Sequence, residues 1–178
     1  MTEPLVYPQT VEALIRALGD KLDADAERQM AEAGINVHDV QAVSPQVWHQ
    51  ATRVGAKVLC PDAPVEVGQF ELGKRFVPGF EGTLLGRGTL ALARVVGPRR
   101  SLQRMKANFR NGNNYTETRL VELGPNRYEM WVSNVVGPEF VRGMILAGLE
   151  VSGARHPRVE TASFDEEGTT YRISWDER

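Results

Sequence analysis

The chain has 178 residues, 42% of them hydrophobic and 25% charged, which is the composition of a globular protein long enough to bury a core. Its net charge of −2 argues against bulk electrostatic binding to nucleic acid or to an anionic membrane, and its single cysteine, Cys60, excludes an internal disulfide and a multi-thiolate metal site. With no signal-type leader and no run of about 20 apolar residues, we expect one cytoplasmic domain over residues 1–178 without a membrane span.

Helical periodicity runs through the first half of the chain. Thr10 is placed to cap a first helix that Gly19 would end, and a second helix is expected over about 23–33. Ser44 followed by Pro45 is typical of a helix cap and a first-turn proline. These signals predict an N-terminal layer of short helices.

The segment 65–96 is the most apolar part of the chain and is punctuated by six glycines. Because each glycine in a helix costs about 1 kcal/mol relative to alanine, the cluster indicates that another backbone or a ligand comes close. Tight helix packing is the simpler of these two explanations. Because proline removes a helical hydrogen bond, we also expect a break near Val77, just before Pro78.

The pattern changes to alternation from Tyr115 onward. Pro138 begins a helical segment between two pairs of predicted strands, which are 115–123, 127–135, about 157–164 and 169–175. The predicted fold class is therefore α+β: an N-terminal helical layer, about 8–110, packed on a four-stranded, mainly antiparallel sheet with ββαββ order, about 114–176.

Recognisable catalytic chemistry is missing from the sequence. It contains no nucleophile elbow, no phosphate-cradling loop and no paired acid and base that stands out from ordinary surface charge. The three histidines, His38, His49 and His156, form no metal-binding pair. We therefore expect a protein that is not an enzyme and holds no metal ion.

The charges are distributed unevenly along the chain. No acidic residue occurs from Gly82 to Thr116, whereas this stretch contains Arg87, Arg94, Arg99, Arg100, Arg104, Lys106 and Arg110. Because arginine binds carboxylates and phosphates with two prongs, this stretch could form an anion or partner contact, with Arg99, Arg100, Arg104 and Arg110 as candidates. The alternative is a solvated basic face, or a surface that meets an acidic partner or the acidic N-terminal helices.

Three blocks of sequence carry a family resemblance. The blocks GNNYTETRL, GPEFVRGMILAGLEVSGA and TYRISW are similar to those of a myxobacterial paralogous family of uncharacterised proteins, and the resemblance covers nearly the whole chain. It implies the extent of the domain rather than an activity.

The order of the predicted elements carries a second, more distant resemblance. Helices followed by ββαββ resemble the domain shared by haem-nitric-oxide-binding sensors, TRAPP vesicle-tethering subunits and 4-vinyl-reductase-type ligand-binding domains. The resemblance implies an apolar pocket between helices and sheet. Tyr115 and Arg119 match in spacing the Tyr-x-Ser-x-Arg motif that holds haem propionates in the sensors, on one face of the expected strand, but Glu117 replaces the serine. The sensors also bind haem through an axial histidine in a helix before this motif, whereas this chain has no histidine from Gln50 to Arg155. We therefore expect no haem or other cofactor.

These observations predict a regulatory or sensory domain that binds a small apolar or amphipathic ligand between the helices of 65–96 and the sheet. The candidate ligand-binding residues are Phe70, Phe76, Phe80, Leu84, Leu85, Tyr115 and Arg119. The turn at 111–114 would be either a structural junction or part of the pocket rim. The alternative function is a homodimeric interaction or scaffolding module, built on the N-terminal helices, without a ligand.

Overall fold

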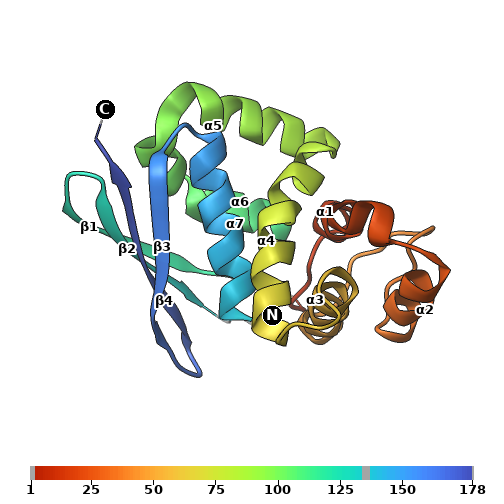
Figure 1. The fold of residues 1–178 in the computed structure, drawn as a ribbon. Helices are drawn as coiled ribbons and strands as arrows, with labels where there is room; N and C mark the ends of the chain where they lie inside the picture. The colour runs from red at the N-terminus through yellow and green to blue at the C-terminus, as the bar shows by residue number, and fades with distance from the viewer. Residues whose placement is uncertain (1–2, 134–136, 178) are drawn as a thin grey trace.

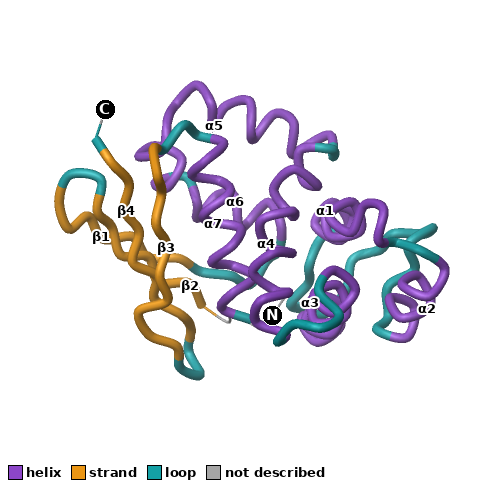
Figure 2. The backbone as a smooth tube through the Cα atoms, in the orientation of Figure 1, coloured by secondary structure: helices purple, strands orange, loops and turns teal. Residues whose placement is uncertain are grey.

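A computed structural model describes residues 3–133 and 137–177 of the chain, with helices first and a sheet last (Figures 1 and 2). The helical part contains α1 (Pro8–Leu18), η1 (Gly19–Lys21), α2 (Ala24–Glu32), α3 (Pro45–Leu59), α4 (Val65–Glu81), α5 (Leu84–Gln103) and α6 (Met105–Gly112). The second part contains β1 (Thr118–Gly124), β2 (Arg127–Ser133), α7 (Pro138–Val151), β3 (Arg155–Phe164) and β4 (Gly168–Asp176). This order confirms the predicted α+β fold.

The four strands form one sheet in the order β1-β2-β4-β3, and every described pair of neighbours is antiparallel. Alternation along β4 places Tyr171, Ile173 and Trp175 on the buried face. β1 begins three residues later than predicted, because the Asn113 side chain accepts hydrogen bonds from the Tyr115 and Thr116 amides and holds that segment in a turn. Residues 134 and 135 of the predicted second strand lie outside the described residues.

α4 is the central helix, with α1 and α3 on one side and α7 on the other (Figure 1). Its glycines allow this arrangement. A Cβ atom on Gly73 would lie 2.0 Å from the Phe140 carbonyl oxygen of α7. The glycine-rich pattern of 65–96 therefore reflects close approach of another backbone, as expected.

Two local predictions in the helical layer are wrong. Pro78 does not break α4, which continues to Glu81, because the proline lies near the end of the helix, where the adjacent Gly79 packs on α1. The break follows at Thr83, which is extended and accepts a hydrogen bond from the Gly86 amide through its side chain. Thr10 is not the cap of α1, which begins at Pro8.

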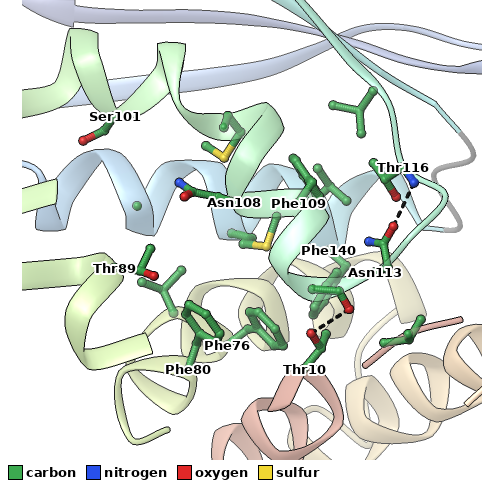
Figure 3. A pocket seen from close by; sticks show the side chains of 18 of the residues that line it. Thr10, Phe76, Phe80, Thr89, Ser101, Asn108, Phe109, Asn113, Thr116 and Phe140 are labelled. Carbon is green, nitrogen blue, oxygen red and sulfur yellow. Dashed lines mark hydrogen bonds between the residues drawn. The ribbon is translucent and has the colours of Figure 1, made fainter. Parts of the chain in front are cut away.

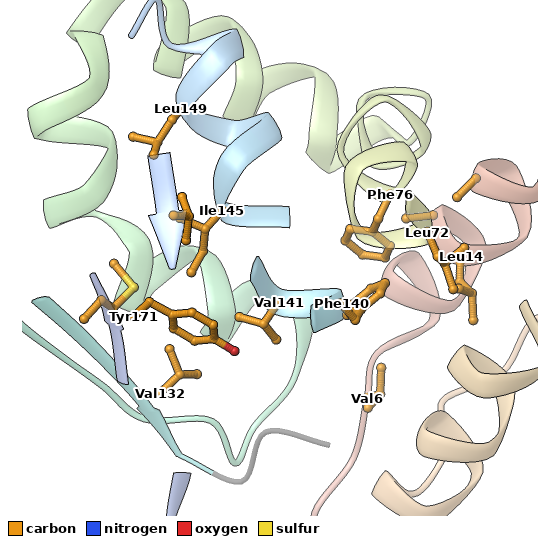
Figure 4. Close-up of a cluster of buried hydrophobic side chains, with 14 of the residues drawn as sticks. Val6, Leu14, Leu72, Phe76, Val132, Phe140, Val141, Ile145, Leu149 and Tyr171 are labelled. Atoms are coloured by element: carbon orange, nitrogen blue, oxygen red, sulfur yellow. The ribbon is translucent and has the colours of Figure 1, made fainter. Parts of the chain in front are cut away.

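One hydrophobic cluster runs from the helical layer into the sheet (Figure 4). Phe76 of α4 and Phe140 of α7 stand edge to face, with ring centroids 5.4 Å apart, and Trp48 of α3 packs against both rings. Val132 of β2 and Tyr171 of β4 extend the same cluster across the sheet. No helix among the described residues is long and apolar enough to cross a membrane.

Candidate ligand-binding cavity

A cavity of about 170 Å³ lies where α4, α5, α6 and α7 meet the segment before β1 and the end of β2 (Figure 3). It forms because the chain turns sharply at Gly97, whose φ is 79°, so that α5 and α6 wrap around the end of α7 instead of packing flat on it. Residues of α4 and α5 from the segment 65–96 and the end of β2 contribute to the cavity, but α6 and α7 line it as well, because α7 separates α4 from most of the sheet.

The walls of the cavity are mainly apolar. They include Phe76, Phe80, Leu90, Leu102, Met105, Phe109, Met144 and Leu149. Every described residue that lines the cavity is uncharged. Because an unpaired charge is costly to bury, a neutral, largely apolar molecule suits these walls best.

Polar side chains interrupt the apolar walls, but most are already engaged. The Thr89 hydroxyl donates to the Leu85 carbonyl at 3.0 Å, and the Ser101 hydroxyl donates to the Ala93 carbonyl at 3.5 Å. The Asn108 side chain points toward the cavity, and its amide group has no hydrogen-bond partner among the described residues (Figure 3). Its side-chain amide can therefore donate to and accept from a bound molecule.

The amide-rich turn at 111–114 holds the N-terminal segment against the cavity. The Thr10 hydroxyl donates to the Gly112 carbonyl at 2.9 Å, and the Asn114 side chain accepts from the Leu5 amide at 2.8 Å. Asn113 lines the cavity, but its side-chain oxygen accepts from the Tyr115 and Thr116 amides at 3.1 and 2.8 Å (Figure 3). The turn is thus a structural junction that also forms part of the rim.

Tyr115 follows this turn and lines the cavity beside Thr116. Burial raises its pKa to about 12, because the surrounding apolar groups disfavour the charged phenolate. The phenol therefore stays neutral at physiological pH.

Three of the predicted ligand-binding residues, Phe76, Phe80 and Tyr115, line the cavity, and the others do not. Leu84 and Leu85 begin α5 on its outer side, and the Leu84 side chain is 88% exposed. Tyr115 and Arg119 do not share a strand face, because β1 begins only at Thr118.

Phe70 and Arg119, which were predicted to bind the ligand, instead take part in cation–π contacts. The Phe70 ring lies under the Arg142 guanidinium, with 4.0 Å from Cζ to the ring centroid. Arg119 lies over the Trp131 ring at the same distance. Neither residue lines the cavity, since α7 covers Phe70 and the outer surface of the sheet holds Arg119.

The candidate arginines of 99–110 do not share one acidic partner. Arg99 pairs with Glu122 at 3.0 Å, and Arg110 pairs with Glu117, which Lys106 also contacts at 3.3 Å. Arg100 and Arg104 are exposed and have no acidic partner among the described residues. Part of the basic stretch thus neutralises acids at and before β1 rather than the acidic N-terminal helices.

Sequence and structure comparisons identify the family and the fold. The family model described as "Protein of unknown function (DUF2378)" matches residues 4–176. The chain belongs to this family. A search of curated proteins gives no match.

The DUF2378 chain resembles solved H-NOX structures over almost its whole length. One is an Fe(II) unliganded mutant of the H-NOX protein from K. algicida, 13% identical with a TM-score of 0.69, with 96% of this chain and 97% of that chain covered. Another is an oxygen-binding H-NOX domain related to soluble guanylate cyclases, 16% identical with a TM-score of 0.67, with 96% of this chain and 95% of that chain covered. A third is the Fe(II) unliganded H-NOX protein from K. algicida, 12% identical with a TM-score of 0.66, with 96% of this chain and 96% of that chain covered. At these identities the likeness shows the fold.

The residues of this chain do not fit a haem. His38 and His156 are exposed and lie beside Glu27 and Asp176, and none of the three histidines lines the cavity. The lining groups able to bind iron are the thioethers of Met105 and Met144 and the Tyr115 phenol, whose raised pKa opposes the phenolate that iron would need. The uncharged lining also offers no cation to the propionates. Among the described residues, no group of three or more histidine, cysteine or acidic side chains could hold a metal ion.

Proposed function

We propose that this chain is a cytoplasmic, non-catalytic regulatory domain that binds a small, neutral, apolar or amphipathic molecule without haem. The observation that carries the proposal is the uncharged cavity among α4, α5, α6 and α7, with the unpaired Asn108 amide on its wall. The H-NOX fold supports a sensory role, since those neighbours include an oxygen-binding domain.

The volume of the cavity limits the ligand. An apolar cavity of about 150 Å³ in another protein binds benzene, whereas pockets for drug-sized ligands occupy roughly 300–1,000 Å³. At about 170 Å³, the cavity suits a compact molecule of few carbon atoms, with a hydroxyl or carbonyl group that pairs with Asn108.

The lining chemistry supports a binding role rather than catalysis. Thr89 and Ser101 donate their hydroxyl protons to backbone carbonyls of α5, and among the described residues no histidine or carboxylate lines the cavity to activate them as nucleophiles. The alternative of a homodimeric module on the N-terminal helices has less support, because no large apolar side chain of α1, α2 or α3 is exposed among the described residues.

Filling the cavity tests the proposal. Gly148 lines the cavity, and a Cβ atom added there meets no heavy atom within 4 Å, so Gly148→Leu should occupy the cavity without disturbing the fold. Native mass spectrometry of the freshly purified full chain should find a small bound mass on the wild type that denaturation removes. The Gly148→Leu protein should lack that mass, whereas Gly88→Ala, an exposed helical position outside the cavity, should retain it.

Titration with benzene and with octanol provides a second measurement on the same variants. Both probes should raise the melting temperature of the wild type and of Gly88→Ala, and neither should raise that of Gly148→Leu. Haemin should give no saturable absorbance band at one equivalent. A saturable haemin band that Gly148→Leu removes would overturn the exclusion of haem. A clean dimeric mass with no ligand and no probe response would favour the interaction module instead.

A further inference from the structure

The outer face of α5 exposes an apolar surface that the core does not need. We call it the α5 stripe and define it by Leu84, Leu85, Leu92 and Val95, residues that are 88%, 39%, 40% and 84% exposed. Scattered exposed leucines are ordinary, but four large apolar side chains on one face of one helix form a candidate interaction site.

Helical geometry places the stripe opposite the cavity. At about 100° per residue, the four side chains point within one arc of the helix, with the small residues Gly88 and Ala91 between them. Gly86 and Leu90, which are buried, lie on the reverse side and pack inward. α5 runs along the outer edge of the molecule in Figure 1, and Leu84 and Val95 on its outer side are largely exposed. The stripe is therefore available to a partner.

The charges around the stripe select an anionic partner. Arg87 and Arg94 lie one above the other along one border of the stripe, and Arg100 follows beyond the bend at Gly97. Arg94 pairs with Glu81 at 2.7 Å, whereas Arg87 and Arg100 are exposed and have no acidic partner among the described residues. The local charge is thus positive although the whole chain carries −2.

We propose that the α5 stripe docks on the surface of an anionic lipid bilayer, with α5 lying in the plane of the interface. Exposed aliphatic side chains bordered by arginines are the chemistry of such interfacial helices, because the apolar face enters the acyl boundary while the cations meet lipid phosphates. A protein partner is less suited, since the apolar part of the stripe consists of leucine and valine, which are under-represented among the residues that dominate the binding energy of protein interfaces. This docking does not depend on a ligand in the cavity.

The stripe and the cavity share one wall. Thr89 lines the cavity and also the shallow groove on the outer side of α5, together with Leu85 and Leu92. Only α5 therefore separates the proposed docking surface from the proposed ligand.

Vesicle sedimentation of the full chain tests the docking. The protein should sediment with vesicles of phosphatidylcholine mixed with phosphatidylglycerol, should bind pure phosphatidylcholine much more weakly, and should be released by high salt. The double variant Leu84→Ser/Val95→Ser should bind at least about tenfold more weakly, since both side chains would lose their burial in the acyl boundary. Arg87→Glu/Arg100→Glu should bind more weakly and should lose the salt dependence.

A matched pair of exposed apolar residues on β1 serves as the control. Val121 and Leu123 are 54% and 50% exposed, and Val121→Ser/Leu123→Ser should bind the anionic vesicles as the wild type does. The proposal is overturned if anionic vesicles do not retain the wild type, or if the β1 variant weakens binding as much as the stripe variant. It is also overturned if the stripe variant abolishes a dimer in sedimentation velocity without any vesicle binding, because the stripe would then join two copies. None of these results bears on the bound mass in native mass spectrometry, which tests the cavity separately.

Discussion

At the scale of single residues, Tyr115 links the cavity to the stability of the fold. Its pKa rises from 10.0 to about 12, so the folded state keeps a proton that the unfolded state loses between these values. Stability is therefore fully present below pH 10 and falls as the pH approaches 12. Between about pH 9 and about pH 11, the free energy of unfolding measured with urea should fall less for Tyr115→Phe than for the wild type. Equal losses would mean that Tyr115 is solvated. Some loss should remain in the variant, because burial raises the pKa of Tyr171 as well.

Which residues line the cavity could be predicted only in part. Phe76 and Phe80 were accessible to sequence reasoning because they recur on one face of an apolar helix. Leu84 and Leu85 belong to the same apolar run, but the break at Thr83 starts a new helix and turns them outward. Asn108 gave no signal, since an asparagine between basic residues has the pattern of a solvated helix face.

At the scale of helices, two glycines of α7 should respond in opposite ways to the same change. A Cβ atom on Gly143 would lie 2.2 Å from the Phe70 carbonyl oxygen, whereas one on Gly148 meets nothing within 4 Å. Gly143→Ala should destabilise the protein by about 1–3 kcal/mol or more, because α4 and α7 must separate. Gly148→Ala should be neutral or stabilising by up to about 1 kcal/mol, through helix propensity. Urea unfolding of both variants measures the difference, and equal effects would contradict the close crossing of α4 and α7.

Local sequence signals predicted the ends of elements well where the chemistry is local. Ser44 caps α3 through the Val47 amide, and the hairpin between β1 and β2 turns at Gly124 to Asn126 as expected. Pro78 shows the limit of such signals. Packing of α4 against α1 and α7 keeps the helix intact, and only the tertiary structure contains that information.

At the scale of the whole molecule, the hydrophobic cluster predicts one cooperative unit over residues 1–178. Trp48 of α3 packs on Phe76 in the helical layer, whereas Trp175 of β4 stacks on Tyr128 in the sheet, and all four residues belong to the same cluster. Two variants that retain only Trp48 or only Trp175 should therefore show the same urea midpoint by fluorescence, because two-state unfolding makes all probes coincide. Separated midpoints would indicate that the helical layer and the ββαββ part unfold independently.

The order of elements, and with it the distant resemblance, could be read from periodicity, and the similarity to H-NOX structures agrees with that prediction. The cavity could not be located in the same way. It depends on the bend at Gly97, which sends α5 and α6 around α7, and periodicity within each helix says nothing about the direction of the bend.

The position of α5 between the cavity and the α5 stripe has a thermodynamic consequence. When two ligands bind to one structural element and the first changes the affinity for the second by some factor, the second changes the affinity for the first by the same factor. If a molecule in the cavity shifts α5 and strengthens its contact with lipid, then lipid must strengthen retention of that molecule by the same factor. The shared border at Thr89 would make the bilayer an effector of the cavity, and the cavity an effector of the bilayer contact.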